Sequence, residues 1–420
     1  MTNTETQSIL VVGGGMSGLT AAIEAAEAGY DAYIVEKNPY LGGRVTQLHY
    51  YFPKLCPPSC GLEINFRRIR QNPRIRFFTM SEVETITGEE GNFDVKIRMN
   101  PRYVNERCTA CGKCAEACTM EIDNPHNFGM NKIKAAYLPH DMAYPPRYVL
   151  DPALVKSDEA QKVKDACPYD AIELDMESRT MDLKVGSIVW ATGWKPYDPG
   201  KLETYGFENY PDVITNVMME RLASWTGPTQ GKIVRPSDGE APETVAFVQC
   251  AGSRDENHLP FCSGVCCLAS MKQATYIREQ YPDALIYICY IDVRATDRLE
   301  AFYTNVKEDE KIRFLKGKVA KVTQHDDGKS LVIRVEDTTT EELHELSVDL
   351  VVLATGMQPN TADNPLPIEI PYDDYGFIAS KDAKAGIIGA GCSRSPMNVS
   401  EAVQDGTAAA LKAIQSIARR

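Results

Sequence analysis

The chain has 420 residues, of which 43% are hydrophobic and 25% are charged, and its formal net charge is -13 at pH 7. This length can bury two or more hydrophobic cores, and the acidic charge argues against nucleic acid or an acidic membrane surface as a partner. No apolar run reaches the roughly 20 residues of a membrane-spanning helix, and the N-terminal MTNTETQS has neither the basic region nor the cleavage site of a secretory signal. We therefore expect a cytoplasmic protein without membrane insertion, whose 13 cysteines serve metal or redox chemistry rather than a disulfide scaffold.

Residues 9–37 contain a dinucleotide-binding fingerprint. A buried-strand run meets Gly13-x-Gly15-x-x-Gly18, an Ala-rich segment follows, and a second apolar run ends in Glu36. In this context the glycines allow a tight turn, a close pyrophosphate and close helix–strand packing, and the helix N-terminus attracts phosphate. Glu36 is placed to accept hydrogen bonds from ribose hydroxyls. The alternative, a strand-to-helix turn without a ligand, fits this complete unit less well. The residues predicted to hold the dinucleotide here are Gly13, Gly15, Met16, Ser17, Gly18, Glu36 and Lys37.

A glycine pair follows in Asn38-Pro-Tyr-Leu-Gly42-Gly43-Arg44. It lets a loop run close to a bound dinucleotide, and Arg44 can reach a phosphate or a flavin oxygen; the alternative is a Gly-rich β-turn. The segment resembles the GG motif of flavoproteins with two dinucleotide-binding domains, which favours FAD over NAD. Residues 74–83 are predicted to form one strand, and the resemblance places the backbone near Val83 against the adenine.

Two further strands, at 185–193 and 350–356, each end in Ala-Thr-Gly. They resemble the paired segments of the same flavoproteins at the junctions between the FAD domain and the second domain, so Thr192 and Gly193 are predicted to contact FAD. Near the C-terminus, Gly391-Cys392 precedes an Ala-rich helix expected over 400–417, where these flavoproteins usually have Gly-Asp. The glycine turn is retained, and Cys392 replaces the acid that would bind the ribitol.

Cys108, Cys111, Cys114 and Cys118 have the C-x2-C-x2-C-x3-C spacing of a [4Fe–4S] ferredoxin loop. Zinc sites more often use two separated pairs, so zinc and free thiols are the weaker alternatives. In two-cluster ferredoxins the fourth cysteine of such a run ligates the other cluster. Cys167-Pro168 looks like the end of a second ferredoxin half that has lost its own triplet, so we predict Cys167 as the fourth ligand, with Cys118 as the alternative.

Residues 243–294 are predicted to form another strand–helix–strand unit, at the place where an NAD(P)H domain would carry its own fingerprint. Instead of G-x-G-x-x-G, the loop contains Cys250-Ala-Gly-Ser-Arg254 and then Cys262-x3-Cys266-Cys267. Ordinary nicotinamide binding is therefore not expected. These residues could serve an interface, a substrate or only the core, and Cys250 and Cys289 are expected to pack as small hydrophobic side chains.

No nucleophile–base set stands out, so the catalytic residues are not identified from sequence. Cys56 and Cys60 lie in the Pro-rich segment 50–61, which is expected to be non-helical, and could form a redox pair beside a flavin or be ordinary buried thiols. Cys262 and Cys266 are the other weak candidates.

Taken together, the GG loop, the ferredoxin-like segment, the terminal GAGC and QCAGSRDENHLPFCSGVCCLASMKQA (249–274) resemble the A-type subunit of heterodisulfide reductase. The resemblance covers nearly the whole chain and is closest to the short A-type proteins of sulfur-oxidising bacteria. It implies FAD, a [4Fe–4S] cluster, a homodimer, and partners that resemble the heterodisulfide reductase B-like and C-like subunits, with a lipoate-binding protein as a further partner.

We therefore predict an α/β protein with two dinucleotide-binding, Rossmann-like domains of the thioredoxin-reductase type and an inserted one-cluster α+β ferredoxin domain. The FAD domain is expected to be discontinuous (1–100, 183–235 and 346–420), the insert to span 101–182, and the second domain 236–345. The predicted function is electron transfer within a heterodisulfide-reductase-like complex of cytoplasmic sulfur oxidation. The alternatives are a stand-alone NAD(P)H-dependent disulfide or polysulfide reductase, and a scaffold subunit with vestigial cofactors.

Overall fold

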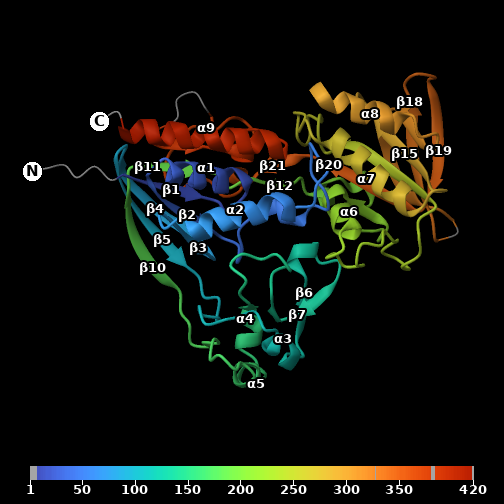
Figure 1. Cartoon of the computed structure of the whole chain (residues 1–420). Helices are drawn as coiled ribbons and strands as arrows, with labels where there is room; N and C mark the ends of the chain where they lie inside the picture. The colour runs from blue at the N-terminus through green and yellow to red at the C-terminus, as the bar shows by residue number, and fades with distance from the viewer. Residues whose placement is uncertain (1–6, 327, 380–383, 419–420) are drawn as a thin grey trace, which may run out of the picture.

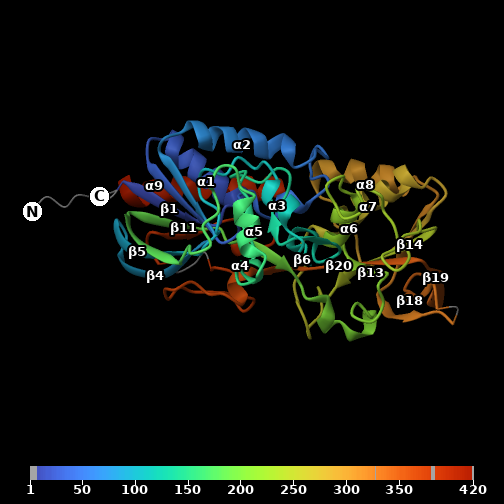
Figure 2. The same ribbon diagram turned by 90° about the horizontal axis from the view of Figure 1, so that it is seen from below.

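A computed structural model describes residues 7–326, 328–379 and 384–418. Most of the N-terminal segment for which no signal sequence was expected lies outside these ranges. Two lobes lie side by side, and residues 100–178, here called the insert, project from the junction between them (Figure 1). Viewed from below, the insert helices stand in front of this junction (Figure 2). In the described part of the chain, no helix is long and apolar enough to cross a membrane.

The first lobe is built on a five-stranded sheet in the order β22-β11-β1-β2-β3, in which every pair is parallel. Its central strand, β1, reads SILVV and is buried throughout, as expected for a strand covered on both faces. The sheet joins segments almost 380 residues apart in the sequence. Its strands are β1 (Ser8–Val12), β2 (Asp31–Glu36), β3 (Ile75–Thr79), β11 (Ser187–Trp190) and β22 (Ile387–Gly389).

Two Ala-rich helices, α1 (Met16–Glu27) and α9 (Val399–Ala418), pack against each other beside this sheet (Figure 1). The buried face of α9 consists of small residues and one isoleucine at helical spacing, so the helix can approach α1 closely. A Cβ added to Gly406 would lie 2.6 Å from the backbone oxygen of Ser17. The contact between these helices therefore brings the C-terminal segment against the fingerprint. A third helix, α2 (Ser59–Gln71), also lies in this lobe.

The single strand predicted over 74–83 is wrong. β3 ends at Thr79, Met80 has a positive φ of 53°, and the chain enters β4 (Ser81–Glu89) of a separate antiparallel sheet. That sheet has the order β10-β5-β4, and the apolar residues of β5 alternate towards the core. Its other strands are β5 (Asn92–Met99) and β10 (Arg179–Val185).

The insert leaves β5 and returns at β10, so both its ends meet one small sheet. Its own core contains Val104, Leu150, Val163 and Ile172 together with several cysteines. Its elements are short: α3 (Lys113–Ala117), β6 (Glu121–Asp123), β7 (Lys132–Lys134), β8 (Ala136–Tyr137), β9 (Val149–Leu150), α4 (Pro152–Val155) and α5 (Ala160–Asp165). That this segment is a ferredoxin domain stays a prediction.

The second lobe has its own parallel sheet in the order β13-β20-β14-β15-β16, with the predicted strand–helix–strand unit at its centre. An antiparallel sheet, β17-β18-β19, packs beside it, and β12 (Trp194–Pro196) pairs with β21 (Met357–Pro359) between the lobes. The remaining elements are β13 (Val213–Thr215), α6 (Asn216–Ala223), β14 (Thr244–Ala251), α7 (Cys266–Gln280), β15 (Leu285–Tyr290), α8 (Glu300–Lys307), β16 (Ile312–Lys316), β17 (Val319–Gln324), β18 (Leu331–Asp337), β19 (Glu342–Val348) and β20 (Leu350–Thr355).

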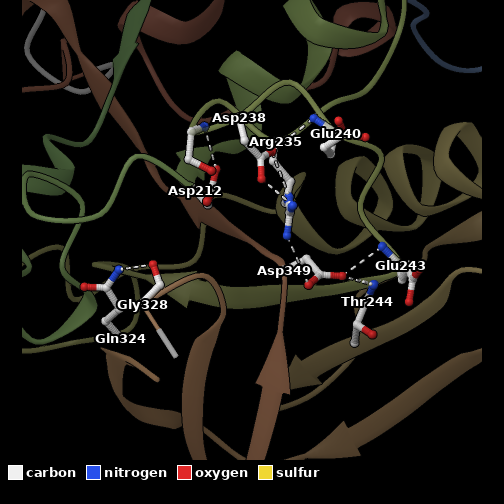
Figure 3. A network of polar contacts seen from close by, with 10 residues as sticks. Asp212, Arg235, Asp238, Glu240, Glu243, Thr244, Gln324, Gly328 and Asp349 are labelled. Carbon is white, nitrogen blue, oxygen red and sulfur yellow. Dashed lines mark hydrogen bonds and ion pairs between the residues drawn. The ribbon is translucent and has the colours of Figure 1, made fainter. Parts of the chain in front are cut away.

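A polar network fixes the start of β14 against the start of β20 (Figure 3). One oxygen of Asp349 accepts the backbone N–H groups of Glu243 and Thr244, at 2.8 and 2.9 Å. The guanidinium of Arg235 lies 3.5 Å from the other Asp349 oxygen and also binds Asp238. The paired carboxylates therefore hold the two central strands of the second lobe in register.

Candidate functional site

The fingerprint opens onto a cavity of about 770 Å³ that the first lobe, the insert and α7 all line. A cavity of this size fits a large cofactor. It brings together almost all of the residues predicted to hold the dinucleotide; only Gly18 and Gly391 stand behind its wall. Those that line it are Gly13, Gly15, Met16, Ser17, Glu36, Lys37, Gly42, Gly43, Arg44, Val83, Thr192, Gly193 and Cys392.

The glycines of the two loops are required by close backbone contacts. Gly13 has a φ of +108°, and a Cβ there would lie 2.2 Å from the backbone oxygen of Ala191. A Cβ on Gly18 would lie 1.9 Å from the oxygen of Gly13, and one on Gly43 2.8 Å from Cα of Gly15. No side chain caps the N-terminus of α1, so its backbone N–H groups are available to a phosphate.

Glu36 stands at the end of β2, buried at the wall of the cavity. One carboxylate oxygen accepts the N–H of Gly14 at 2.6 Å, and the other accepts the backbone and side-chain N–H groups of Asn38, both at 2.8 Å. Burial raises the pKa of Glu36, and these hydrogen bonds oppose the rise. The carboxylate is thus fixed where a ribose hydroxyl pair can donate to it.

Arg44 and Thr192 meet at the junction with the second lobe. The Arg44 guanidinium lies over the Trp194 ring, 5.1 Å from its centroid, and Nε donates to the Trp194 carbonyl at 2.5 Å. Burial lowers the pKa of Arg44 to about 10, so the side chain remains a cation at neutral pH. The Thr192 hydroxyl is buried without a hydrogen-bond partner and lines the cavity. An orphaned hydroxyl and a buried cation fit a polar, anionic ligand.

The terminal glycine turn contacts the fingerprint from the other side. Gly391 has a φ of +62°, and a Cβ there would lie 2.0 Å from Oγ of Ser17. Its N–H donates to the Asp405 carboxylate at 2.6 Å. The thiol of Cys392 donates to the Met397 carbonyl at 3.5 Å. An acid is therefore present at this turn after all, but α9 supplies it.

Sequence reasoning missed a buried ion pair in the same cavity. Nζ of Lys272 on α7 lies 2.9 Å from a Glu220 oxygen on α6, and both side chains are at most 4% exposed. Glu220 also accepts the Gln273 amide at 2.7 Å and the His49 N–H at 3.0 Å. A buried, paired ammonium places a fixed positive charge beside whatever the cavity holds.

Aromatic side chains close the cavity towards the insert. The rings of His126 and His140 stack at 4.6 Å, and Tyr40 packs edge-on against both. Nε2 of each histidine is buried without a hydrogen-bond partner. Burial, with Arg221 nearby, lowers the pKa of His140 to about 4, and burial keeps the pKa of His126 well below its usual value. Both rings are therefore neutral at physiological pH.

The four predicted cluster ligands line one small cavity of the insert, and we call them the insert thiols: Cys108, Cys111, Cys114 and Cys167. Sγ of Cys167 accepts the N–H of Ala171 at 3.4 Å, as cluster-bound sulfur commonly does. Burial raises the pKa of Cys114 to about 12, with the neighbouring Cys108 and Cys111 adding to the rise, so a thiolate there needs a bound cation.

Cys118, the alternative fourth ligand, points elsewhere. It is 2% exposed, packs in the insert core, and donates to the Met120 carbonyl at 3.5 Å. In the described ranges, no three Cys, His, Asp or Glu side chains converge on a single metal position. A [4Fe–4S] cubane binds one thiolate at each iron, so its ligands surround a cluster rather than a point, and the insert thiols fit that requirement.

A second set of four cysteines meets in the second lobe, and we call them the second-lobe thiols: Cys250, Cys262, Cys266 and Cys267. Each buried member raises the pKa of its neighbours, after the larger effect of burial. The polar side chains of Gln249, Ser253 and Ser270, from the same segments, are buried without hydrogen-bond partners. Cys250 is buried as expected, but its φ of 56° and a bulge in β14 take it out of the strand pattern. Cys289 is a buried core residue, as expected.

The segment 50–61 was expected to be non-helical, but α2 begins at Ser59 and includes Cys60. Cys56 and Cys60 are not deeply buried, and their thiols are in hydrogen-bonding contact. Pro57 and Pro58 hid this start, because proline is favoured in the first turn of a helix.

Known structures with a similar fold are thioredoxin reductases. That of Lactococcus lactis has a TM-score of 0.53 at 14% identity and covers 99% of this chain and all of its own. That of T. acidophilum has a TM-score of 0.52 at 15% identity, covering 97% and 98%. Residues 8–56 match the family model of FAD-dependent oxidoreductases. Fold and site thus define a FAD-dependent oxidoreductase with two dinucleotide-binding domains, which confirms the predicted class.

Sequence relatives are more specific, and they are A-type subunits of CoB–CoM heterodisulfide reductases. One of the A-type iron–sulfur subunits of Methanopyrus kandleri is 38% identical over 98% of this chain and 65% of its own length. The A-type iron–sulfur subunit of Methanocaldococcus jannaschii is 36% identical over 96% and 63%. That of the ferredoxin/F420H2-dependent enzyme of Methanosarcina acetivorans is 35% identical over 97% and 53%. The chain is therefore homologous to the A-type subunit of heterodisulfide reductase over nearly all its residues, and it spans less than two thirds of these relatives.

Proposed function

We propose that this chain binds FAD in the large cavity and a [4Fe–4S] cluster on the insert thiols, and that it transfers electrons between them within a heterodisulfide-reductase-like complex. The observation that carries the proposal is the presence of both built sites in one chain, on either side of the histidine stack. The names of the homologues, iron–sulfur subunits of heterodisulfide reductases, support it.

The residues divide the work of holding the flavin. Gly13 and Gly15 admit the pyrophosphate to the N-terminus of α1, and Glu36 accepts the ribose hydroxyls. Lys272 favours a negative charge on the group beside it, so it stabilises the reduced state of a bound flavin. Bound FAD accepts or gives one or two electrons, whereas a cluster carries one.

We also infer that the second-lobe thiols hold a second cluster. Four cysteines surrounded by orphaned buried polar groups are costly as free thiols, and those groups can donate to cluster sulfides. The loop that bears them replaces the glycine fingerprint of a nicotinamide site. This replacement supports electron exchange with partner proteins rather than with NAD(P)H.

The partners follow from the same proposal. They are heterodisulfide reductase B-like and C-like subunits and a lipoate-binding protein, with the chain itself a homodimer in the cytoplasm and the pathway one of sulfur oxidation. An anaerobic affinity purification, with FAD, iron and co-purifying proteins quantified, tests it. Near-stoichiometric FAD and iron support the proposal, whereas a cofactor-free chain that still binds its partners supports the scaffold alternative.

Mixing the purified protein with NADH or NADPH decides the remaining alternative. The proposal predicts that neither bleaches the flavin absorbance rapidly. Rapid bleaching would instead support a stand-alone NAD(P)H-dependent reductase.

A further inference from the structure

Cys56 and Cys60 are the cysteines that neither set of four uses and that solvent can reach. Cys60 is exposed and Cys56 is half-buried, while Cys118, Cys289 and Cys392 are buried. Both thiols of the pair are free, and they are in hydrogen-bonding contact with each other. Two free thiols that already touch can form a disulfide with little movement of the chain.

Tyr51 connects this pair to the large cavity. Its backbone N–H donates to the Cys56 carbonyl at 3.0 Å, in an isolated antiparallel bridge. Its hydroxyl stands beside α2, where a Cβ on Gly61 would lie 2.6 Å from it. Burial and then the two thiols raise the pKa of Tyr51. The same side chain lines the cavity, so one ring spans the distance from the dithiol to the cofactor site.

The two thiols differ in reactivity. Cys60 lies in the first turn of α2, a helix of 13 residues without a side-chain N-cap, where free N–H groups and the helix dipole stabilise a thiolate. Burial and the Cys60 thiol raise the pKa of Cys56. Lys54 lies near Cys56, and Ile64, which is 50% exposed, lies one helical turn beyond Cys60. These neighbours suit an organic disulfide that carries an acidic group.

We propose that Cys56 and Cys60 form a redox-active dithiol that reduces such a disulfide, with Cys60 attacking first and Cys56 resolving. The Cys60 thiolate attacks one substrate sulfur, forming a mixed disulfide and releasing the first thiolate, which takes up a proton. The Cys56 thiolate then attacks Sγ of Cys60, releasing the second thiol and leaving a Cys56–Cys60 disulfide. The substrate gains two electrons and two protons, and the pair loses them. Return to the dithiol requires two electrons and two protons, which in our scheme come from the reduced flavin, so this return rests on the proposed function.

The test uses the full chain with its cofactors under anaerobic conditions, and one equivalent of dithiobis(nitrobenzoate), an aromatic disulfide with acidic groups. The wild-type protein is expected to release both equivalents of the coloured thiol and retain none. Cys56→Ser is expected to release one equivalent and retain the other on Cys60. Cys60→Ser is expected to react at least about tenfold more slowly. Cys56→Ser/Cys60→Ser measures the background of the other cysteines.

Retention of the mixed disulfide on Cys60 in the wild-type protein would overturn the proposal, as would a double variant that releases thiol as fast as the wild type. A second measurement isolates the flavin. In photoreduced protein, the probe should reoxidise the flavin in the wild type but not in Cys56→Ser/Cys60→Ser. A preparation without FAD would contradict the proposed function, and the thiol stoichiometry would still decide whether the pair is a dithiol.

Discussion

Replacing Glu36 by glutamine should weaken FAD binding by a predictable amount. The buried carboxylate is held by three N–H donors from Gly14 and Asn38, at 2.6 to 2.8 Å, so it cannot turn away from the cavity. Glutamine replaces one acceptor oxygen by an NH2 group and removes the negative charge. The loss of one hydrogen bond to a charged group is worth about 1.5–3 kcal/mol, which corresponds to a Kd for FAD that is about 10- to 150-fold higher.

The assay is a fluorescence titration of the FAD-depleted protein with FAD. Glu63→Gln, on the exposed face of α2, is the matched control and should leave the Kd unchanged. Because burial raises the pKa of Glu36, the affinity of the wild-type protein should also fall as the pH is lowered through that raised value, and Glu36→Gln should lose this dependence. A Kd within about threefold of the wild type in Glu36→Gln would refute the assigned role.

Three further predictions concern the other groups. Cys167→Ser should abolish the EPR signal of the reduced insert cluster and Cys118→Ser should not; the reverse would transfer the fourth-ligand role to Cys118. Lys272→Met should lower the flavin midpoint potential by about 30 mV, the shift that 1.4 kcal/mol gives a two-electron couple, and Lys272→Arg should retain it; equal potentials in spectroelectrochemistry would contradict the charge argument. His140 has a pKa of about 4 instead of 6.5, so unfolding takes up a proton between these values and stability falls by roughly 3 kcal/mol as the pH drops through them. In urea titrations His140→Phe should flatten this loss, and His344→Phe, in β19, should not.

Local motifs predicted the parts of the site in which the backbone itself binds the ligand. The glycines at 13, 15, 42 and 43 could be identified because tight turns and close backbone contacts impose a residue type at a fixed position in the sequence. Cys167 could be proposed because its Cys-Pro context resembles the end of a ferredoxin half. The homologues and fold neighbours bear out the resulting class of protein.

Contacts between distant segments were not predictable in the same way. Lys272 and Glu220 pair from two different helices, and His126 and His140 stack only because the insert folds back on the first lobe. Within the fold, the break at Met80 carries no glycine or proline signal. Cys250 was predicted to be a strand core residue, and only the bulge in β14 brings it to the other second-lobe thiols.

The central claim is that one chain carries a flavin and a cluster that exchange electrons. An anaerobic reductive titration of the purified protein, followed by visible absorbance and EPR, tests it most directly. The account predicts bleaching of one flavin together with a [4Fe–4S] signal that Cys167→Ser removes while the flavin remains, and a second cluster signal that survives in that variant. A protein with a flavin and no cluster signal, or with clusters and no flavin, would contradict it.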